Sequence, residues 1–266
     1  MTALPQDDLG AMPPTDTIAT RKGELEYTLS GDGPATIVLL NGAGMTLDGW
    51  NALYPSIEQL GRVFAWNRFG VQGSADPPAT QDGAAVVASL RELLARAGVR
   101  PPYVLVGHSL GGLHANLFAR LHPSDVAAVL FLEATHPHDQ DVLEQDEEQL
   151  KRGLTNVLAQ PPREFEANLH AEMEAAAETV DEVSSAGPFP PVPVAVVTGG
   201  MDPPKSLLSP DAAQARRERQ LALARLSPHG EHVLAACSGH FPQRTEPELV
   251  LRVLGRLVER ALQPRG

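Results

Sequence analysis

The feature that most constrains this chain is an alternation of short apolar runs with longer segments in which apolar residues recur at helical spacing. A continuous apolar run that forms a strand is buried on both faces, as in a parallel sheet. Successive strand–helix–strand units join such strands through right-handed crossovers. The predicted strands span 15–21, 24–29, 36–40, 63–66, 103–106, 126–132, 192–197 and 233–236, and the predicted helices span 50–60, 84–97, 110–121, 211–226 and 246–262. The sequence therefore predicts an α/β fold, a mostly parallel central sheet flanked by helices.

The alternation is interrupted between residues 134 and 191. This stretch contains no strand-like run, and its helical segments, 145–158 and 165–183, are separated by two adjacent prolines. An insertion at the carboxyl edge of a sheet is placed to cover a site there. The expected organisation is a flexible N-terminal arm at 1–14, a core at 15–133 and 192–266, and a helical lid insertion at 134–191.

Composition narrows the range of partners. The length of 266 residues suits one domain with an insertion, and the formal net charge of −12 argues against nucleic acid as a partner. The N-terminus lacks the basic and apolar regions of a signal peptide, and no apolar run reaches the length of a membrane span. His136 and His138 stand close together, but no further ligand cluster supports a metal site. We expect a cytoplasmic protein that acts on a small molecule, without a cofactor, a metal or a membrane span.

One short motif points to the chemistry. The sequence GHSLG at 107–111 follows a predicted strand directly and opens a predicted helix. A serine on so tight a turn is lifted above the edge of the sheet, and the glycines on either side let strand and helix pass close by. The helix N-terminus beneath it favours developing negative charge. The letters G-x-S-x-G alone occur often by chance and can mark a simple glycine-rich turn, but this context predicts that Ser109 is a nucleophile.

Four segments, in order, resemble the motifs of the α/β-hydrolase fold family. LLNGAG at 39–44 is similar to the family's His-Gly oxyanion turn, with Asn41 in place of the usual His. WNRFGVQGS at 66–74 is similar to its D-x-R-G-x-G-x-S loop, with Asn67 in place of the Asp. GHSLGG at 107–112 resembles its nucleophile elbow, and SGHFPQRTEPELV at 238–250 resembles its His loop. The resemblance extends over residues 24–262 and implies an α/β-hydrolase fold.

An oxyanion hole and a base are the next requirements. Acyl transfer places negative charge on the former carbonyl oxygen, and two fixed backbone N–H groups should face that oxygen. One belongs to Leu110, directly after the nucleophile, and the resemblance implies that the other belongs to Ala43. A general base that titrates near neutrality is normally His. Among nine histidines, His240 follows the last predicted strand and precedes the final helix, so it is the expected base.

Two carboxylates follow strands at the correct edge and are candidates to orient His240. Asp202 follows the predicted strand 192–197, which is the commoner placement in the family. Glu133 follows an earlier strand, 24 residues after Ser109, which resembles one haloalkane dehalogenase subgroup and some esterases. An ionised carboxylate at an apolar strand end needs a partner, whereas an aspartate in a proline-rich loop can merely cap a turn. The balance favours Glu133, and both stay candidates.

The fold does not fix the reaction. Dehalogenases and epoxide hydrolases of this fold use an Asp nucleophile, and Ser109 argues against both. Ser109, His240 and an acid predict hydrolysis of a carboxylic ester or thioester through an acyl-enzyme. The alternatives are a lyase or cofactor-free oxygen-transfer enzyme with the same triad, a peptidase or amidase, and a non-catalytic ligand receptor. Product analysis separates the first of these, and binding without turnover would mark the last.

Overall fold

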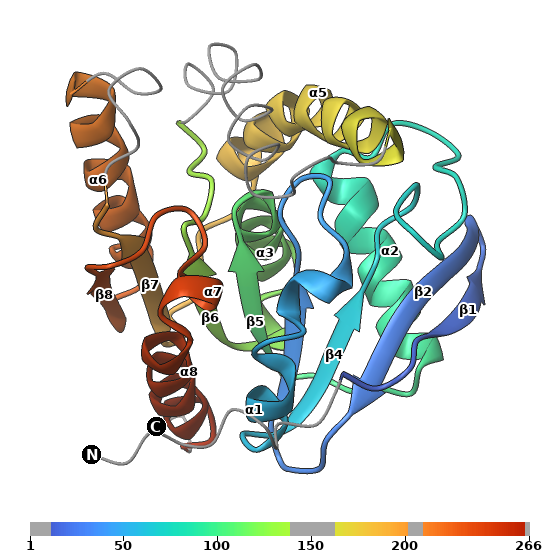
Figure 1. Ribbon diagram of the computed structural model, residues 1–266, viewed down its shortest axis with the longest axis horizontal. Helices are drawn as coiled ribbons and strands as arrows, with labels where there is room; N and C mark the ends of the chain where they lie inside the picture. The colour runs from blue at the N-terminus through green and yellow to red at the C-terminus, as the bar shows by residue number, and fades with distance from the viewer. Residues whose placement is uncertain (1–11, 139–162, 202–209, 264–266) are drawn as a thin grey trace.

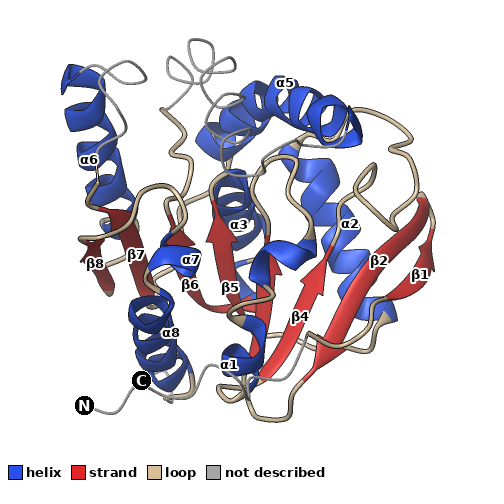
Figure 2. Cartoon of the chain, viewed as in Figure 1, coloured by secondary structure: helices blue, strands red, loops and turns tan. Residues whose placement is uncertain are grey.

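The computed structural model describes residues 12–138, 163–201 and 210–263, in which eight strands form one sheet (Figures 1 and 2). The strands are β1 (Asp16–Thr20), β2 (Gly23–Ser30), β3 (Thr36–Leu40), β4 (Arg62–Trp66), β5 (Tyr103–His108), β6 (Val126–Leu132), β7 (Val194–Gly199) and β8 (Gly230–Ala235). Their spatial order is β1-β2-β4-β3-β5-β6-β7-β8. Every neighbouring pair from β4 to β8 is parallel, and β2 pairs antiparallel with both β1 and β4. The predicted mostly parallel sheet is confirmed.

Helices cover both faces of this sheet, as the alternation predicts. In Figure 1, α1 (Tyr54–Glu58) and α8 (Pro247–Ala261) lie in front of the sheet, and α2 (Gly83–Arg96) and α3 (Leu110–Leu121) lie behind it. Two separate apolar clusters fill the space between these helices and the strands. The other helices within the described residues are α5 (Arg163–Ser185), α6 (Pro210–Ala224), α7 (Pro242–Thr245) and the short 3₁₀ turns η1 (Leu47–Trp50) and η2 (Pro123–Asp125).

The prediction of one helix over residues 50–60 is wrong. The chain forms η1 and then α1, which starts only at Tyr54 and has Pro55 in its first turn. A proline in the interior of a helix lacks the N–H donor and collides with the preceding turn, so no single helix can run through Pro55. The strand predicted at 192–197 likewise starts two residues later, at Val194, because Pro193 has no N–H to give to a ladder.

Helix α5 belongs to the predicted insertion. It lies across the end of the sheet towards which β4 and β5 point, next to α2 and α3 (Figure 1). Its buried residues Leu169, Ala176 and Val180 join the apolar cluster that includes α2 and α3. This half of the insertion therefore packs firmly on the body of the protein. The helix predicted at 145–158 and most of the predicted N-terminal arm lie outside the described residues.

The helices in the described part of the chain differ in length and in apolar character. None of them combines the length and the apolar character that crossing a bilayer requires.

Candidate active site

Ser109 occupies the single-residue turn between β5 and α3. Its backbone has φ 51° and ψ −124°, a left-handed value of φ that a non-glycine residue rarely adopts. The Ser109 N–H donates to the carbonyl of Leu132 at 3.1 Å, and its carbonyl accepts from the N–H of Thr135 at 3.0 Å. These bonds to the end of β6 hold the strained turn in place. Ser109 itself is only partly buried, whereas its neighbours His108 and Leu110 are buried.

The glycines around Ser109 are required by close packing. A Cβ on Gly107 would come within 2.6 Å of the Gly111 carbonyl oxygen and of the Gly112 Cα. A Cβ on Gly111 would meet the backbone of Leu40 and Asn41. Both approaches are closer than real Cβ atoms make, so strand β5, helix α3 and the loop after β3 can converge only with glycine here. The glycines therefore set the tight strand-to-helix turn that was expected from the motif.

Strand β6 ends in a second strained residue. Glu133 follows β6 directly with φ 46°, and its N–H donates to the carbonyl of Val197 on β7 at 3.0 Å. Among the described residues, only Gln72, Ser109 and Glu133 combine a side chain with positive φ. Two of these three stand side by side at the ends of neighbouring parallel strands. Strain of this kind costs about 1–3 kcal/mol per residue and gathers at functional sites.

The Glu133 carboxylate is almost completely buried and faces three groups. Its Oε1 accepts from the N–H of Gly199 at 2.5 Å. Its Oε2 forms an ion pair with the Arg216 guanidinium of α6 and lies 3.6 Å from His240 Nδ1. The separation from His240 exceeds a hydrogen bond and corresponds to an ion pair only when the ring is protonated. Hydrogen bonds of active sites are often this long before substrate binds.

His108, the residue before Ser109, contacts His240 and holds its loop close to the turn between β5 and α3. His108 Nε2 lies 2.8 Å from the His240 carbonyl oxygen, and the two rings lie 4.9 Å apart. Because a carbonyl can only accept, His108 Nε2 carries the proton. Burial and the neighbouring His240 lower the pKa of His108 to about 3. His108 is therefore a neutral packing group that ties the His240 loop to Ser109, and it is not poised as a second base.

The charge state of His240 depends on its two neighbours. Burial and the Arg216 guanidinium lower the pKa of His240 to about 4. The ring is thus neutral at physiological pH and able to accept a proton. Glu133 acts in the opposite sense, since a carboxylate beside Nδ1 favours the imidazolium. Arg216 competes with His240 for that carboxylate and so limits how strongly the protonated ring is stabilised.

The loop after β3 passes close to Ser109. A Cβ on Gly42 would lie 3.2 Å from the Ser109 Cβ, so only glycine fits easily at this point. Ala43 follows, and none of the hydrogen bonds found between described residues uses its N–H. Asn41 braces the loop: its Nδ2 donates to the Trp66 carbonyl at 3.1 Å, and its Oδ1 accepts from the Trp50 indole at 2.5 Å. Asn41 therefore replaces the family's His as a structural residue.

An ion pair from the insertion ties down the same loop. Arg68 donates to the carbonyls of Asn41 and Gly42 at 2.8 and 2.7 Å. The same guanidinium binds Glu172 of α5 through Nε at 2.5 Å and Nη2 at 2.9 Å. Glu172 Oε2 also accepts from the N–H of Gly44 at 2.6 Å. Both side chains are nearly completely buried, at 3% and 5% exposure. Arg68 and Glu172 thus bind the loop on both sides of Ala43, at Gly42 and at Gly44.

The structure brings most of the sequence-predicted site residues to one end of the sheet. Ser109 and Glu133 follow the neighbouring strands β5 and β6, Leu110 opens α3, and His240 lies in the loop after β8, near Glu133. The loop of Ala43 follows β3, the other neighbour of β5. Asp202, the alternative acid, lies outside the described residues. The paired roles of Arg216 with Glu133 and of Glu172 with Arg68 had no signal in the sequence. Arg68 belongs to the motif at 66–74, but no pattern in the sequence indicates that Glu172 is its partner.

The described side chains do not form a metal site. In the described part of the chain, no group of three or more His, Cys, Asp or Glu side chains is arranged to hold a metal ion. The rings of His136 and His138 lie 5.2 Å apart, and the His138 N–H donates to His136 Nδ1 at 3.0 Å. Nδ1 of His136 is therefore occupied by a local turn.

Comparison with known proteins identifies the relatives of this arrangement. A sequence profile of the alpha/beta hydrolase fold matches residues 35–186. An uncharacterized protein of Schizosaccharomyces pombe is 37% identical over 84 residues, which cover 32% of this chain and 16% of that relative. The chain therefore corresponds to a small share of that protein's length.

Solved structures resemble the chain over nearly its whole length. An enol-lactonase from Burkholderia xenovorans LB400 superposes with a TM-score of 0.67 at 18% identity, covering 92% of this chain and 100% of the other. A thermophilic esterase from Thermogutta terrifontis superposes with a TM-score of 0.66 at 20% identity, covering 94% and 100%. At these identities the likeness concerns the fold.

Proposed function

The chain belongs to the α/β-hydrolase fold family, and from that premise we propose that it is a serine hydrolase that cleaves a carboxylic ester or thioester. Ser109 is the nucleophile, His240 the general base and acid, and Glu133 the carboxylate that orients His240. The backbone N–H groups of Ala43 and Leu110 bind the oxyanion. Residues 134–191 serve as the lid, with apolar side chains that suit a small or medium acyl or alcohol group.

The observation that carries this proposal is the strained backbone of Ser109. A left-handed φ at a non-glycine residue is costly and persists only where the surroundings impose it. The turn gives no packing advantage to a serine, since Ser109 is partly exposed and glycines would relieve the strain. What the turn does provide is a serine directly before the first residue of helix α3 and beside Gly42. A nucleophile needs that position.

The mechanism follows from the polarity of each group. The Ser109 hydroxyl loses its proton to His240 Nε2 as Oγ bonds to the substrate carbonyl carbon. The carbonyl oxygen takes the negative charge and is met by the N–H groups of Ala43 and Leu110. His240 returns the proton to the departing alcohol or thiol, which leaves an acyl-enzyme. A water molecule then attacks, gives its proton to His240 and releases the acid, and the proton returns to Ser109.

Glu133 supports these steps through Nδ1 of His240. A carboxylate there fixes the tautomer with the proton on Nδ1, so that Nε2 is free to accept. It also stabilises the imidazolium that forms in each half-reaction. Glu172 and Arg68 support the steps differently, since they hold the loop that presents the N–H of Ala43. A displaced loop would lose the oxyanion contact even with an intact Ser109, His240 and Glu133.

The test combines covalent labelling with turnover. The wild-type chain should react with a fluorophosphonate probe and should hydrolyse p-nitrophenyl esters, with a preference along an acyl chain-length series. Ser109→Ala should lose the label and several orders of magnitude of kcat. Ser124→Ala, at an exposed serine, is the matched control and should behave as wild type. Normal labelling of a folded Ser109→Ala variant would overturn the assignment, and products other than acid plus alcohol would favour a lyase or oxygen-transfer enzyme.

A further inference from the structure

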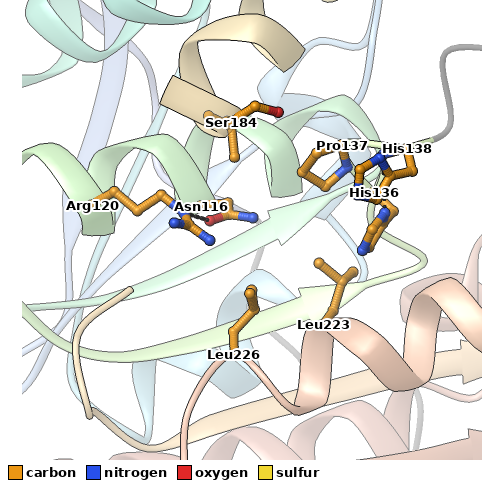
Figure 3. Close-up of a pocket in the computed structure, with 9 residues that line it drawn as sticks. Asn116, Arg120, His136, Pro137, His138, Ser184, Leu223 and Leu226 are labelled. Carbon is orange, nitrogen blue, oxygen red and sulfur yellow. Dashed lines mark hydrogen bonds between the residues drawn. The ribbon is translucent and has the colours of Figure 1, made fainter. Parts of the chain in front are cut away.

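A pocket of about 200 Å³ lies away from the candidate active site, between α3, the end of α5, the segment 136–138 and α6. None of Ser109, Glu133 and His240 lines it. Figure 3 shows its polar wall, formed by Asn116 and Arg120 of α3, and two apolar side chains facing that wall. The volume is below that of pockets for drug-sized molecules, which indicates a small ligand.

Asn116 places an amide donor at this pocket. It is 1% exposed, its Oδ1 accepts from Arg120 Nε at 2.8 Å, and its Nδ2 has no hydrogen-bond partner in the described part of the chain. The orientation of the amide is fixed, because an arginine can only donate and so must face the oxygen. The nitrogen end points away from Arg120, towards the space between Ser184, His136 and Leu226 (Figure 3). A buried donor without an acceptor is costly and rare in proteins.

Arg120 adds a positive charge beside that donor. Its Nε and Nη1 donate to Asn116 and to the Gly187 carbonyl, the latter at 2.9 Å. No ion pair between described residues gives Arg120 a carboxylate partner. No carboxylate is found among the described lining residues either, in a chain whose net charge is −12. The local charge of this pocket is therefore opposite to that of the molecule.

The ring of His136 is a second polar group in the lining. His136 Nδ1 accepts from the His138 N–H, so the proton of the neutral ring is on Nε2. Burial and the proximity of His138 and Arg219 lower the pKa of His136 to about 4, which keeps this ring neutral near pH 7. The apolar lining comes from Val183 on α5, Leu223 on α6 and Leu226 just after α6. Pro137, His138 and Ser184 complete the described lining.

We propose that this pocket binds a small carboxylate with an apolar body. The carboxylate oxygens accept from Asn116 Nδ2 and from Arg120, and the apolar body packs between Val183, Leu223 and Leu226. A single arginine suits one negative charge better than a dianion such as phosphate, and the apolar walls disfavour an inorganic ion. The proposal stands independently of the reaction at Ser109.

The test is calorimetric titration of the full-length chain with sodium benzoate, with neutral benzamide as the matched ligand. We expect saturable one-to-one binding of benzoate and at least tenfold weaker binding of benzamide. Asn116→Asp keeps the acceptor for Arg120 but puts a negative oxygen where the donor was, so it should weaken benzoate at least tenfold. Arg120→Met should do the same.

Two controls locate the binding. Arg91→Met, which removes an arginine from an exposed ion pair with Asp125, should leave the benzoate affinity unchanged. Ser109→Ala should also leave it unchanged, whether or not Ser109 proves to be a nucleophile. The absence of saturable binding would overturn the proposal. So would an affinity that is unaffected by both Asn116→Asp and Arg120→Met, because benzoate would then be bound elsewhere.

Discussion

Two buried carboxylates, Glu133 and Glu172, look alike in chemistry and differ in what they hold. Each is nearly inaccessible to solvent, each pairs with an arginine, and each accepts one backbone N–H, from Gly199 and Gly44 respectively. Glu133 sits at the strained end of a strand and shares its charge with a titratable ring. Glu172 sits on a helix of the insertion and shares its charge only with groups that keep their protons. Glu133 is therefore suited to stabilise a histidine that gains and loses a proton. Glu172 is suited to fix the position of a loop.

Buried ion pairs at this end of the sheet fix the positions of loops and side chains more than they add stability. A buried ion pair gains little net stability, because desolvation offsets the attraction, but breaking it by removing one partner costs about 3–5 kcal/mol. Such pairs are therefore better understood as devices that fix position. The Arg68–Glu172 pair has fork geometry and two further carbonyl contacts, which leave it one arrangement. The Glu133–Arg216 pair leaves one side of the carboxylate for His240.

The largest effect is expected at Glu133. Glu133→Gln should lower kcat by roughly ten-thousand-fold, because an amide cannot stabilise the imidazolium and allows the wrong tautomer of His240. Asp202→Asn should stay within about tenfold of wild type. Steady-state kinetics on p-nitrophenyl esters measures both, after each variant has been shown to melt cooperatively. The reverse ranking would transfer the role of the acid to Asp202.

Glu172 should show a smaller and differently distributed effect. Glu172→Gln should lower kcat by about a hundredfold. This is at the lower end of the decrease in kcat that follows the loss of one oxyanion donor. The double replacement of Arg68 and Glu172 by Met removes both charges together, so most of the stability should return while kcat stays low. An equivalent double replacement of the more exposed pair Arg91 and Asp125 is the control. Recovery of full kcat with the double Met variant would mean that the pair only supports the fold.

A third prediction concerns the competition for Glu133. The pKa of His240 is lowered to about 4, so kcat/KM in the wild type should hold down to about pH 5 and fall below that. Arg216→Met removes the competing cation, and the acid limb should move up towards 6.5. Burial also lowers the pKa of His240 and remains in the variant, so the limb should stop short of 6.5, and at pH 5 the variant should keep a smaller share of its plateau value than the wild type. An acid limb at the same pH in both proteins would show that Arg216 does not control His240.

The smallest effect is thermodynamic and concerns His108. Its pKa is lowered to about 3 in the fold, whereas the unfolded chain binds that proton near 6.5. The unfolded state therefore binds more protons between these values, and stability falls as the pH drops from 6.5 towards 3. His108→Gln can keep a donor to the His240 carbonyl and removes this titration. The free energy of unfolding of His108→Gln should depend less steeply on pH than that of the wild type, by up to about 1.4 kcal/mol per pH unit.

Urea unfolding at several pH values between 4 and 7 checks this last prediction. His229→Gln, at an exposed position, is the matched control and should keep the wild-type slope. An unchanged slope in His108→Gln would mean that other groups dominate the acid sensitivity.

The sequence predicts the strand ends better than the contacts between helices and loops. Ser109 could be recognised because its chemistry depends on a local turn, written in adjacent residues. Glu133 and His240 could be expected near Ser109 because parallel strands end at one edge. Arg68 and Glu172 are 104 positions apart and meet only because α5 packs over the sheet. Arg216 reaches Glu133 in the same way, from the face of α6. Helix faces and side-chain reach are set by tertiary packing, which residue spacing does not encode.

The central claim is that catalysis passes through a covalent acyl group on Ser109. Rapid mixing of the wild-type chain with an excess of p-nitrophenyl ester, acid quenching and peptide mapping by mass spectrometry tests it directly. During turnover a peptide containing Ser109 should carry the acyl mass, with a burst of p-nitrophenol where deacylation is slower than acylation. His240→Ala should show neither. Steady turnover with no acyl mass on Ser109 under conditions where a burst is seen, or with the acyl group on another residue, would contradict it.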